Sequence, residues 1–289
     1  MDWKQAVIDT LSQVLHKEIH EFSDRYIGGG SINDTRMIQT DQGSFFVKIN
    51  LAERYPAMFE KEALGLKALN DAGVLRVPQV IATGESGKEA FLILEWIESA
   101  PYKSGFWEDF GKKMALLHLH HNDEFGFDHD NYIGSLPQSN RYHSVWSSFF
   151  VSERLEPQIK LARNTQKIDR KIVQMFERFF KKTPALFPEE KPSLVHGDLW
   201  SGNFMTDEKG EAVIMDPAVY YGHREMDLAM SQLFGGFDPR FYAAYHEIFP
   251  LESGWQERMD FCNLYPLMVH VNLFGGGYLN SVISILKRF

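Results

Sequence analysis

Two apolar runs that each lead into an acidic residue constrain this chain more than any other feature. Leu194 and Val195 run into a histidine, and Asp198 and Asn203 follow. A second run, VIM at 213–215, ends directly in Asp216. Such runs are typical of short core strands, where an unpaired carboxylate is costly because it loses its hydration. The pattern therefore indicates two acids and an amide at strand ends, with their charge balanced by other groups.

Composition excludes several classes of protein. The chain has 289 residues, 44% of them hydrophobic, which is enough for a large core and for two lobes. The net charge of -9 and the absence of a long basic run argue against nucleic acid or an anionic membrane as the main partner. One cysteine, Cys262, allows no internal disulfide. We find neither a signal-peptide pattern nor an apolar stretch long enough to span a bilayer, so we expect a cytoplasmic protein. No surface pattern predicts an oligomeric state.

Hydrophobic spacing predicts an α+β protein with two lobes. A small N-terminal lobe, residues 1–97, should hold a sheet and two helices, and residues 98–289 should form a larger, mostly helical lobe. Ser, Pro and Gly cluster near the expected boundary, at 97–104. The predicted helices are 3–16 and 57–72 in the first lobe, and 106–119, 145–163 and 168–181 in the second.

A glycine-rich segment separates the first two predicted strands. It reads GGGSIN at 28–33. Glycines allow backbone amides to approach a phosphate, so the amides of Gly29, Gly30, Ser31, Ile32 and Asn33 are candidates for binding one. A flexible hairpin turn explains the same segment without any ligand.

A lysine lies inside the apolar strand that follows. Lys48, in FFVKIN, needs a partner if its ammonium faces inward. Glu62 is our candidate rather than Glu60, because Leu66 and Leu69 follow it by four and seven residues and place it on the inward side of its helix. A Lys–Glu pair of this kind holds ATP phosphates in kinase-like sites. The alternative is an edge-strand lysine that reaches water.

The acids of the opening feature have the spacing of a phosphotransfer site. In the pattern H-x-D-x-x-x-x-N, Asp198 is the candidate base for a substrate hydroxyl, and Asn203 can bind Mg²⁺. Asp216, after its short strand, is the second candidate metal ligand. A pair of turn-forming Asp and Asn residues is the alternative, but the glycine loop and the lysine precede them in the required order.

The motifs HGDLWSGN and DPA resemble the aminoglycoside and choline kinase branch of the protein-kinase-like fold. Further segments, including DPAVYYGHREMDLAM at 216–230 and FGFDHDNYIGSLPQSN at 125–140, resemble the fructosamine kinase family, also called ketosamine-3-kinases. This resemblance runs nearly from end to end. It implies a bilobal fold and ATP- and Mg²⁺-dependent phosphorylation of a ketosamine at O3, followed by loss of the phosphate and release of the amine. Bacterial and plant members of the family generally favour ribulosamines and erythrulosamines over fructosamines.

The resemblance also implies roles for further residues. The backbone of Glu95, Trp96 and Ile97 should bind adenine at the hinge between the lobes. A second set, in the larger lobe, is expected at the ketosamine: Trp200, His270, Asn272 and Tyr278. A core or capping role is the alternative for each of these. Asp227 is expected to brace the catalytic loop through hydrogen bonds rather than to touch substrate.

Two other functions stay open at this point. A kinase for another small hydroxyl substrate, of the aminoglycoside or choline type, would share the fold. A pseudokinase would bind nucleotide without turnover, although Lys48, Asp198, Asn203 and Asp216 are all present. The substrate could be a free ketosamine or one carried by a protein.

Overall fold

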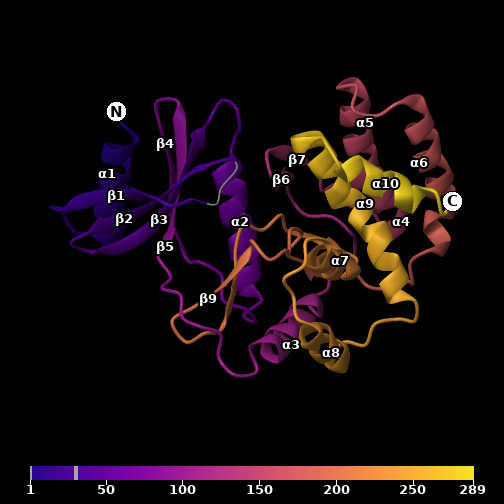
Figure 1. Ribbon diagram of the computed structural model, residues 1–289. Coiled ribbons are helices and arrows are strands. Elements are labelled where there is room, and N and C mark those ends of the chain that lie inside the picture. The colour runs from indigo at the N-terminus through magenta and orange to yellow at the C-terminus, as the bar shows by residue number, and fades with distance from the viewer. Residues whose placement is uncertain (1, 29–31) are drawn as a thin grey trace. The chain divides into compact units, whose positions relative to one another are not determined.

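The computed structural model describes residues 2–28 and 32–289 and divides into two compact units, which are treated separately below (Figure 1). The first unit comprises Met1–Ser104 and Met205–Pro217. The second comprises Gly105–Phe204 and Ala218–Phe289. The segment 205–217, which carries Asp216, therefore belongs with chain that is distant from it in sequence.

The first unit is built on a five-stranded antiparallel sheet in the order β1-β2-β3-β5-β4. Consecutive hairpins account for most of this order, and a helix between β3 and β4 makes the one crossover. The elements are α1 (Trp3–Leu15), β1 (Phe22–Tyr26), β2 (Asp34–Thr40), β3 (Gly43–Leu51), α2 (Met58–Asp71), β4 (Val80–Ser86), β5 (Glu89–Glu95) and the short β10 (Ala212–Ile214).

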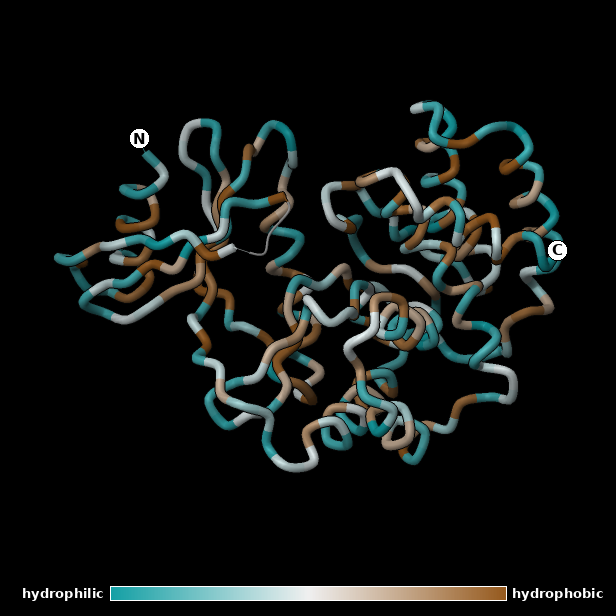
Figure 2. Tube along the Cα trace, in the orientation of Figure 1, coloured by the Kyte–Doolittle hydropathy of each residue, from teal (hydrophilic) through white to brown (hydrophobic). Residues whose placement is uncertain are grey.

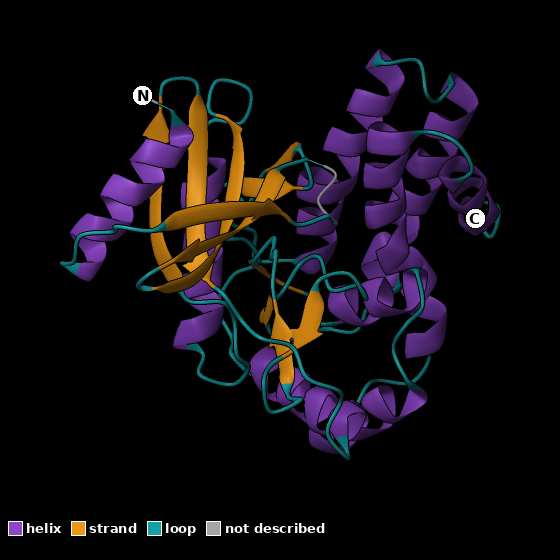
Figure 3. Ribbon diagram, turned by 60° about the vertical axis from the view of Figure 1, so that its left-hand side comes forward, coloured by secondary structure: helices purple, strands orange, loops and turns teal. Residues whose placement is uncertain are grey.

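Helices cover both faces of this sheet (Figure 3). On one face α1 buries Trp3, Val7 and Leu11 against the strands, as its predicted spacing requires. Figure 2 shows hydrophobic residues along the strands that meet this helix. Because side chains alternate along a strand, Val47 of β3 faces α1 and its neighbour Lys48 faces α2. The alternation therefore carries a lysine to the side of the sheet where α2 packs.

The second unit is mostly helical. Its helices surround short antiparallel pairs, β6 with β7 and β8 with β11. β9 (Phe204–Thr206) starts in this unit and pairs with β10. The other elements are α3 (Phe106–His118), β6 (Asn131–Ile133), β7 (Leu136–Gln138), α4 (Trp146–Phe149), α5 (Glu156–Asn164), α6 (Arg170–Lys182), a 3₁₀ turn (Thr183–Ala185), β8 (Ser193–Val195), β11 (Tyr220–Gly222), α7 (Glu225–Leu233), α8 (Pro239–Ile248), α9 (Trp255–Phe274) and α10 (Tyr278–Leu286).

The predicted continuous α-helix over 145–163 is wrong in its middle. A π-helical turn, Phe150–Leu155, separates α4 from α5. Pro157 has no N–H to donate to the carbonyl of Glu153, which removes one α-helical bond at this point. The wider turn also buries two adjacent charged side chains: Glu153 accepts bonds from Arg141, and the Arg154 guanidinium lies 3.9 Å from the ring centre of Tyr220. Hydrophobic spacing alone gave no sign of this insertion.

None of the helices within residues 2–28 and 32–289 combines the length and apolar character that crossing a membrane requires.

Candidate active site

A lysine held between two carboxylates forms the polar centre of the first unit. The Lys48 Nζ lies 2.7 Å from Glu62 Oε1 and 2.6 Å from Asp216 Oδ1. The prediction that Glu62 rather than Glu60 pairs with this lysine is confirmed. Leu66 is buried on the same side of α2, as its spacing from Glu62 predicted. A strand, a helix and a distant segment thus bring three charged groups together.

The electrostatics of this cluster keep the lysine charged. The side chain of Lys48 is 4% exposed, and burial alone would lower the pKa of its ammonium. The neighbouring Asp216 and Glu62 carboxylates outweigh burial and raise that pKa above its usual value. Asp216 is about half exposed and has a φ of 56°, a left-handed conformation that is uncommon outside glycine. Its carboxylate therefore both pairs with Lys48 and reaches solvent at a strained turn.

The glycine-rich segment is only partly described. Gly29, Gly30 and Ser31 lie outside the described residues, so their predicted role stays a prediction. The described ends of the segment are joined, because Ile27 N donates to Thr35 O at 2.9 Å. Asn33 accepts a bond from the Asn50 side chain of β3 at 3.2 Å. Ile32 and Asn33 are thereby attached to the same unit as Lys48.

The residues of the predicted hinge are held by local bonds. The Glu95 side chain accepts from the Gln79 backbone at 3.0 Å and pairs with Arg76 at 3.2 Å. Trp96 donates to Glu98, and Ile97 is buried. These side chains make contacts within their own unit, and the binding of adenine by the backbone of these residues stays a prediction.

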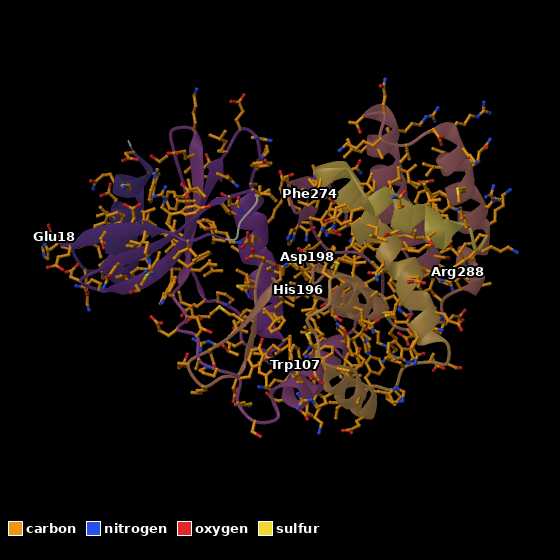
Figure 4. All side chains as sticks on the ribbon, in the orientation of Figure 1. Glu18, Trp107, His196, Asp198, Phe274 and Arg288 are labelled. Carbon is orange, nitrogen blue, oxygen red and sulfur yellow. The ribbon has the colours of Figure 1, made fainter. Side chains whose placement is uncertain are left out.

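In the second unit, the loop after β8 forms a tight turn around Asp198. The Asn203 Nδ2 donates to the carboxylate of Asp198 at 2.9 Å and to its backbone carbonyl at 2.8 Å. Trp200 lies within the turn and accepts from Asn203 N at 2.9 Å. Both bonds from Asn203 to Asp198 use the side-chain nitrogen Nδ2. The side-chain oxygen Oδ1 is therefore the atom of this amide that is left to bind a cation. Figure 4 labels Asp198 next to His196 in this loop.

Two glycines of HGDLWSG are required by close contacts. A Cβ on Gly197 would lie 2.1 Å from the carbonyl oxygen of Ala218, and its φ is 82°. A Cβ on Gly202 would lie 2.4 Å from the indole of Trp200. The first contact seats the loop on the chain that follows Asp216, and the second holds Trp200 against the loop. The motif's glycines thus position the groups on either side of Asp198.

A buried aspartate braces this loop. Asp227, at the start of α7, accepts from His196 N at 2.7 Å and from Gly197 N at 2.9 Å. Its carboxylate also lies 3.1 Å from His118 Nε2, and His118 Nδ1 lies 2.7 Å from the Tyr245 hydroxyl. The predicted brace is therefore present, and it extends through His118 of α3 to α8. The ring of His118 therefore links α3 and α8 to the catalytic loop through Asp227.

We expect Asp227→Ala to lower both stability and turnover. The substitution leaves two buried backbone amides without an acceptor, which costs about 3 kcal/mol of unfolding free energy. A loop displaced by about 1 Å should lower kcat roughly 100-fold while the KM for ATP stays unchanged. Urea unfolding and steady-state kinetics measure the two effects. Asp227→Asn, which keeps one acceptor oxygen, is the matched variant and should recover much of both. An unchanged kcat in folded Asp227→Ala protein would limit the residue to a structural role.

A small pocket lies beside Asp198. It has a volume of about 20 Å³, room for about one water molecule. Predicted residue His270 of α9 lines it together with Asp198. The remaining lining residues are Ile133, Gly197, Met226, Met230, Tyr265, Pro266 and Val269. The pocket is the size of a hydroxyl group rather than of a whole sugar.

Aromatic rings continue from this pocket toward the surface. The ring of His270 lies 4.9 Å from that of Tyr278 and 4.8 Å from that of Phe234, and Phe234 meets Trp200 at 5.9 Å. Three of the four predicted substrate residues therefore belong to one row of rings. Asn272 does not: its amide donates to Gln158, which ties α9 to α5.

The donors present fit a magnesium ion that arrives with a nucleotide. Among residues 2–28 and 32–289, no group of three or more His, Cys, Asp or Glu side chains is placed to hold a metal. Asn203 and Asp216, each in its own unit, offer hard oxygen atoms. Mg²⁺ typically takes one or two carboxylates together with substrate phosphates and water, so the Asp216 carboxylate is a donor of the expected kind, and the Asn203 side-chain oxygen is a second hard donor.

Several residues that support the site were not predicted. Gln138 of β7 donates to the carbonyl of Ala218 at 3.1 Å and accepts from the Tyr265 hydroxyl at 2.6 Å. Asn131 donates to the Val219 carbonyl at 2.8 Å. These bonds fix the backbone just after Asp216 within the second unit. Each partner is more than 75 residues away in sequence, so no local pattern could identify the pairing.

Comparison with known proteins gives one consistent family. A family model described as fructosamine kinase matches residues 3–289. A candidate ketoamine kinase of Enterococcus faecium is 42% identical over 90% of this chain and 93% of its own. The chloroplastic protein-ribulosamine 3-kinase of Arabidopsis thaliana is 43% identical over 91% of this chain and 81% of its own.

Solved structures agree with this result. The crystal structure of a candidate fructosamine-3-kinase from Thermobifida fusca has a TM-score of 0.87 and 32% identity, over 98% of this chain and 97% of its own. An aminoglycoside phosphotransferase, with a TM-score of 0.63 and 14% identity over 98% of both chains, shares the fold. The predicted kinase-like fold, a sheet-containing N-terminal part followed by a mostly helical remainder, is confirmed. The chain belongs to the fructosamine kinase family.

Proposed function

We propose that this protein transfers the γ-phosphoryl group of ATP to the O3 hydroxyl of a ketosamine, with ribulosamines as the preferred sugars. The observation that carries the proposal is the loop in which Asn203 holds the Asp198 carboxylate beside a pocket of hydroxyl size. The name of the Arabidopsis relative, a protein-ribulosamine 3-kinase, supports the choice of sugar.

The residues of the second unit act on the acceptor. The hydroxyl binds in the pocket beside Asp198, which orients it and takes up its proton as the new O3–P bond forms. The bond from Pγ to the β,γ-bridging oxygen breaks, and ADP leaves. Trp200, His270 and Tyr278 form an apolar wall for the rest of the substrate. His270 donates its Nδ1 proton to the Pro266 carbonyl at 2.7 Å, and burial lowers the pKa of its imidazole, so the ring is neutral at pH 7.

The residues of the first unit act on the nucleotide. Lys48, kept charged by Glu62 and Asp216, binds the α- and β-phosphates, and the amides from Gly29 to Asn33 cover them. The backbone of residues 95–97 binds adenine. Asn203 and Asp216 would hold Mg²⁺, which when bound neutralises charge on the transferring phosphates.

Product analysis tests the reaction itself. ³¹P and ¹³C NMR of ribuloselysine incubated with ATP and Mg²⁺ should show one phosphate, attached at C3. Enolisation toward C1, loss of that phosphate and hydrolysis of the resulting imine should then release free lysine. A phosphate at any other position would contradict the proposed orientation of the sugar.

We expect His270→Gln to weaken binding of the acceptor and not of the nucleotide. The substitution removes a ring from the row of aromatic side chains beside the pocket. The KM for ribuloselysine should rise about 10-fold, consistent with the loss of 1–1.5 kcal/mol of ring contact, and the KM for ATP should not change. Asn272→Ala, at a residue of the same helix that lies away from the pocket, is the control and should leave both KM values near wild type. Equal rises in the two KM values would refute a role in acceptor binding.

A further inference from the structure

Positively charged residues of the second unit are concentrated in one segment, residues 160–182. Residues 160–182, which cover the end of α5 and all of α6, contain eight Lys or Arg and two acidic residues in a chain whose net charge is -9. Figure 4 shows nitrogen-tipped side chains extending from these helices, and Figure 2 colours much of this part of the chain as hydrophilic. This basic segment is the main exception to the acidic character of the protein.

A groove between α6 and α10 opens within this basic segment. Its volume is about 480 Å³. Lys171 and Arg178 of α6, and Lys287 at the end of α10, are exposed along its rim. Among the described residues, none of these three cations forms an ion pair with a carboxylate. The one acid that lines the groove, Asp169, caps α6 by accepting from Ile172 N at 3.0 Å.

The floor of the groove is aliphatic. Ile172 and Met175 are buried and Ile283 is half-buried, whereas no aromatic ring lines the groove. An apolar floor inside a cationic rim matches a peptide that presents an aliphatic side chain between carboxylates. A single-stranded nucleic acid would instead need rings on which its bases stack, and the net negative charge of the protein disfavours a long polyanion.

We propose that this groove docks an acidic segment of the protein that carries the ketosamine. The inference rests on the proposed function, and it selects protein-bound over free ketosamines as the substrate that the enzyme is adapted to bind. It adds a recognition site apart from the sugar pocket.

The path from groove to pocket runs along α10. Tyr278 at the start of this helix lies 4.9 Å from His270, which lines the pocket beside Asp198. Lys287 follows Tyr278 by nine residues, about 14 Å at the rise of an α-helix. An extended peptide covers that distance in about four residues. One substrate chain can therefore place a modified lysine at the pocket and an acidic segment in the groove.

Two synthetic peptides test the proposal. Each carries one ribulosyllysine four residues from the sequence Leu-Glu-Glu-Glu or, in the neutral peptide, Leu-Gln-Gln-Gln. Three exposed ion pairs of ordinary strength correspond to about a tenfold difference in binding, so the wild type should show a KM about tenfold lower for the acidic peptide. That preference should weaken as salt rises, and kcat should be the same for both peptides.

Charge-reversal variants assign the preference to the groove. Lys171→Glu with Arg178→Glu and Lys287→Glu should abolish it, while the KM for free ribuloselysine stays unchanged. The matched control reverses three exposed lysines outside the groove, Lys17, Lys88 and Lys191, and should keep the preference. Equal KM values for the two peptides in the wild type would overturn the inference.

Two further outcomes are informative. If the wild type bound a fluorescent oligonucleotide and the groove variant did not, while the groove variant kept the preference for the acidic peptide, the groove would be a nucleic-acid surface. That result would overturn the inference. If free ribuloselysine itself were not phosphorylated, the proposed function would fail, which is a result distinct from the loss of peptide preference.

Discussion

Asp198→Asn is expected to reduce kcat by at least about 1,000-fold, the upper part of the range for a positioned acid–base group combined with loss of orientation of the nucleophile. An amide keeps the shape of the side chain but does not accept the hydroxyl proton. The substituted side chain can still meet Asn203, since an amide oxygen accepts the same bond. ATP binding should therefore be unchanged. Single-turnover assays and calorimetric titration with ATP measure the two quantities separately.

The control for this result is Asn203→Ala. This substitution removes two groups at once: the Nδ2 donor that lies 2.9 Å from the Asp198 carboxylate, and the side-chain oxygen that is proposed to bind Mg²⁺. It should raise the Mg²⁺ concentration needed for half-maximal activity, which Asp198→Asn should not do. Turnover by Asp198→Asn near the wild-type rate would refute the assignment of the base.

Lys48→Met is expected to have the second largest effect. The substitution removes the cation from between Glu62 and Asp216, so the two carboxylates are left facing each other. We expect kcat/KM for ATP to fall about 100-fold or more, since roughly 3 kcal/mol of charged contact with the phosphates is lost. The unfolding free energy should fall by about 2 kcal/mol, less than for a fully buried pair, because Asp216 is half exposed.

Two substitutions on α2 separate the pairing role from general charge effects. Glu62→Gln removes the carboxylate that lies 2.7 Å from Lys48. Glu60→Gln makes the same change two residues earlier, where no ion pair with the lysine is present among the described residues. The first should lower kcat/KM for ATP and the second should not. Equal effects of the two would show that the pair does not position the lysine.

Sequence patterns predicted the parts of the site that depend on local periodicity. The i, i+4, i+7 spacing from Glu62 to Leu66 and Leu69 predicted which glutamate of α2 pairs with Lys48 if the lysine faces inward, and the structure shows that pair. The spacing of Asp198 and Asn203 predicted that the two side chains lie close together, and in the structure they are hydrogen-bonded to each other. In each case residues within one short stretch of chain determine the geometry, so their spacing in the sequence is enough to predict it.

Other parts depend on contacts that no local pattern encodes. The π-helical turn at 150–155 places Arg154 against Tyr220, and the brace joins Asp227 to His118 and Tyr245. Asp216 joins Lys48 across 168 residues of sequence. Such pairings are set by the packing of whole helices. The order of motifs along the chain indicated only that the residues belong to one kind of site.

The most direct test of the central claim is ATP consumption, with Mg²⁺ and equal concentrations of ribuloselysine, fructoselysine, an aminoglycoside and choline, and with Asp198→Asn as the control protein. The account predicts turnover on the two ketosamines, fastest with ribuloselysine, and none in the control. Turnover on the aminoglycoside or choline alone would contradict the proposed substrate, and ATP binding without turnover on any acceptor would contradict the proposal of a kinase for ketosamines.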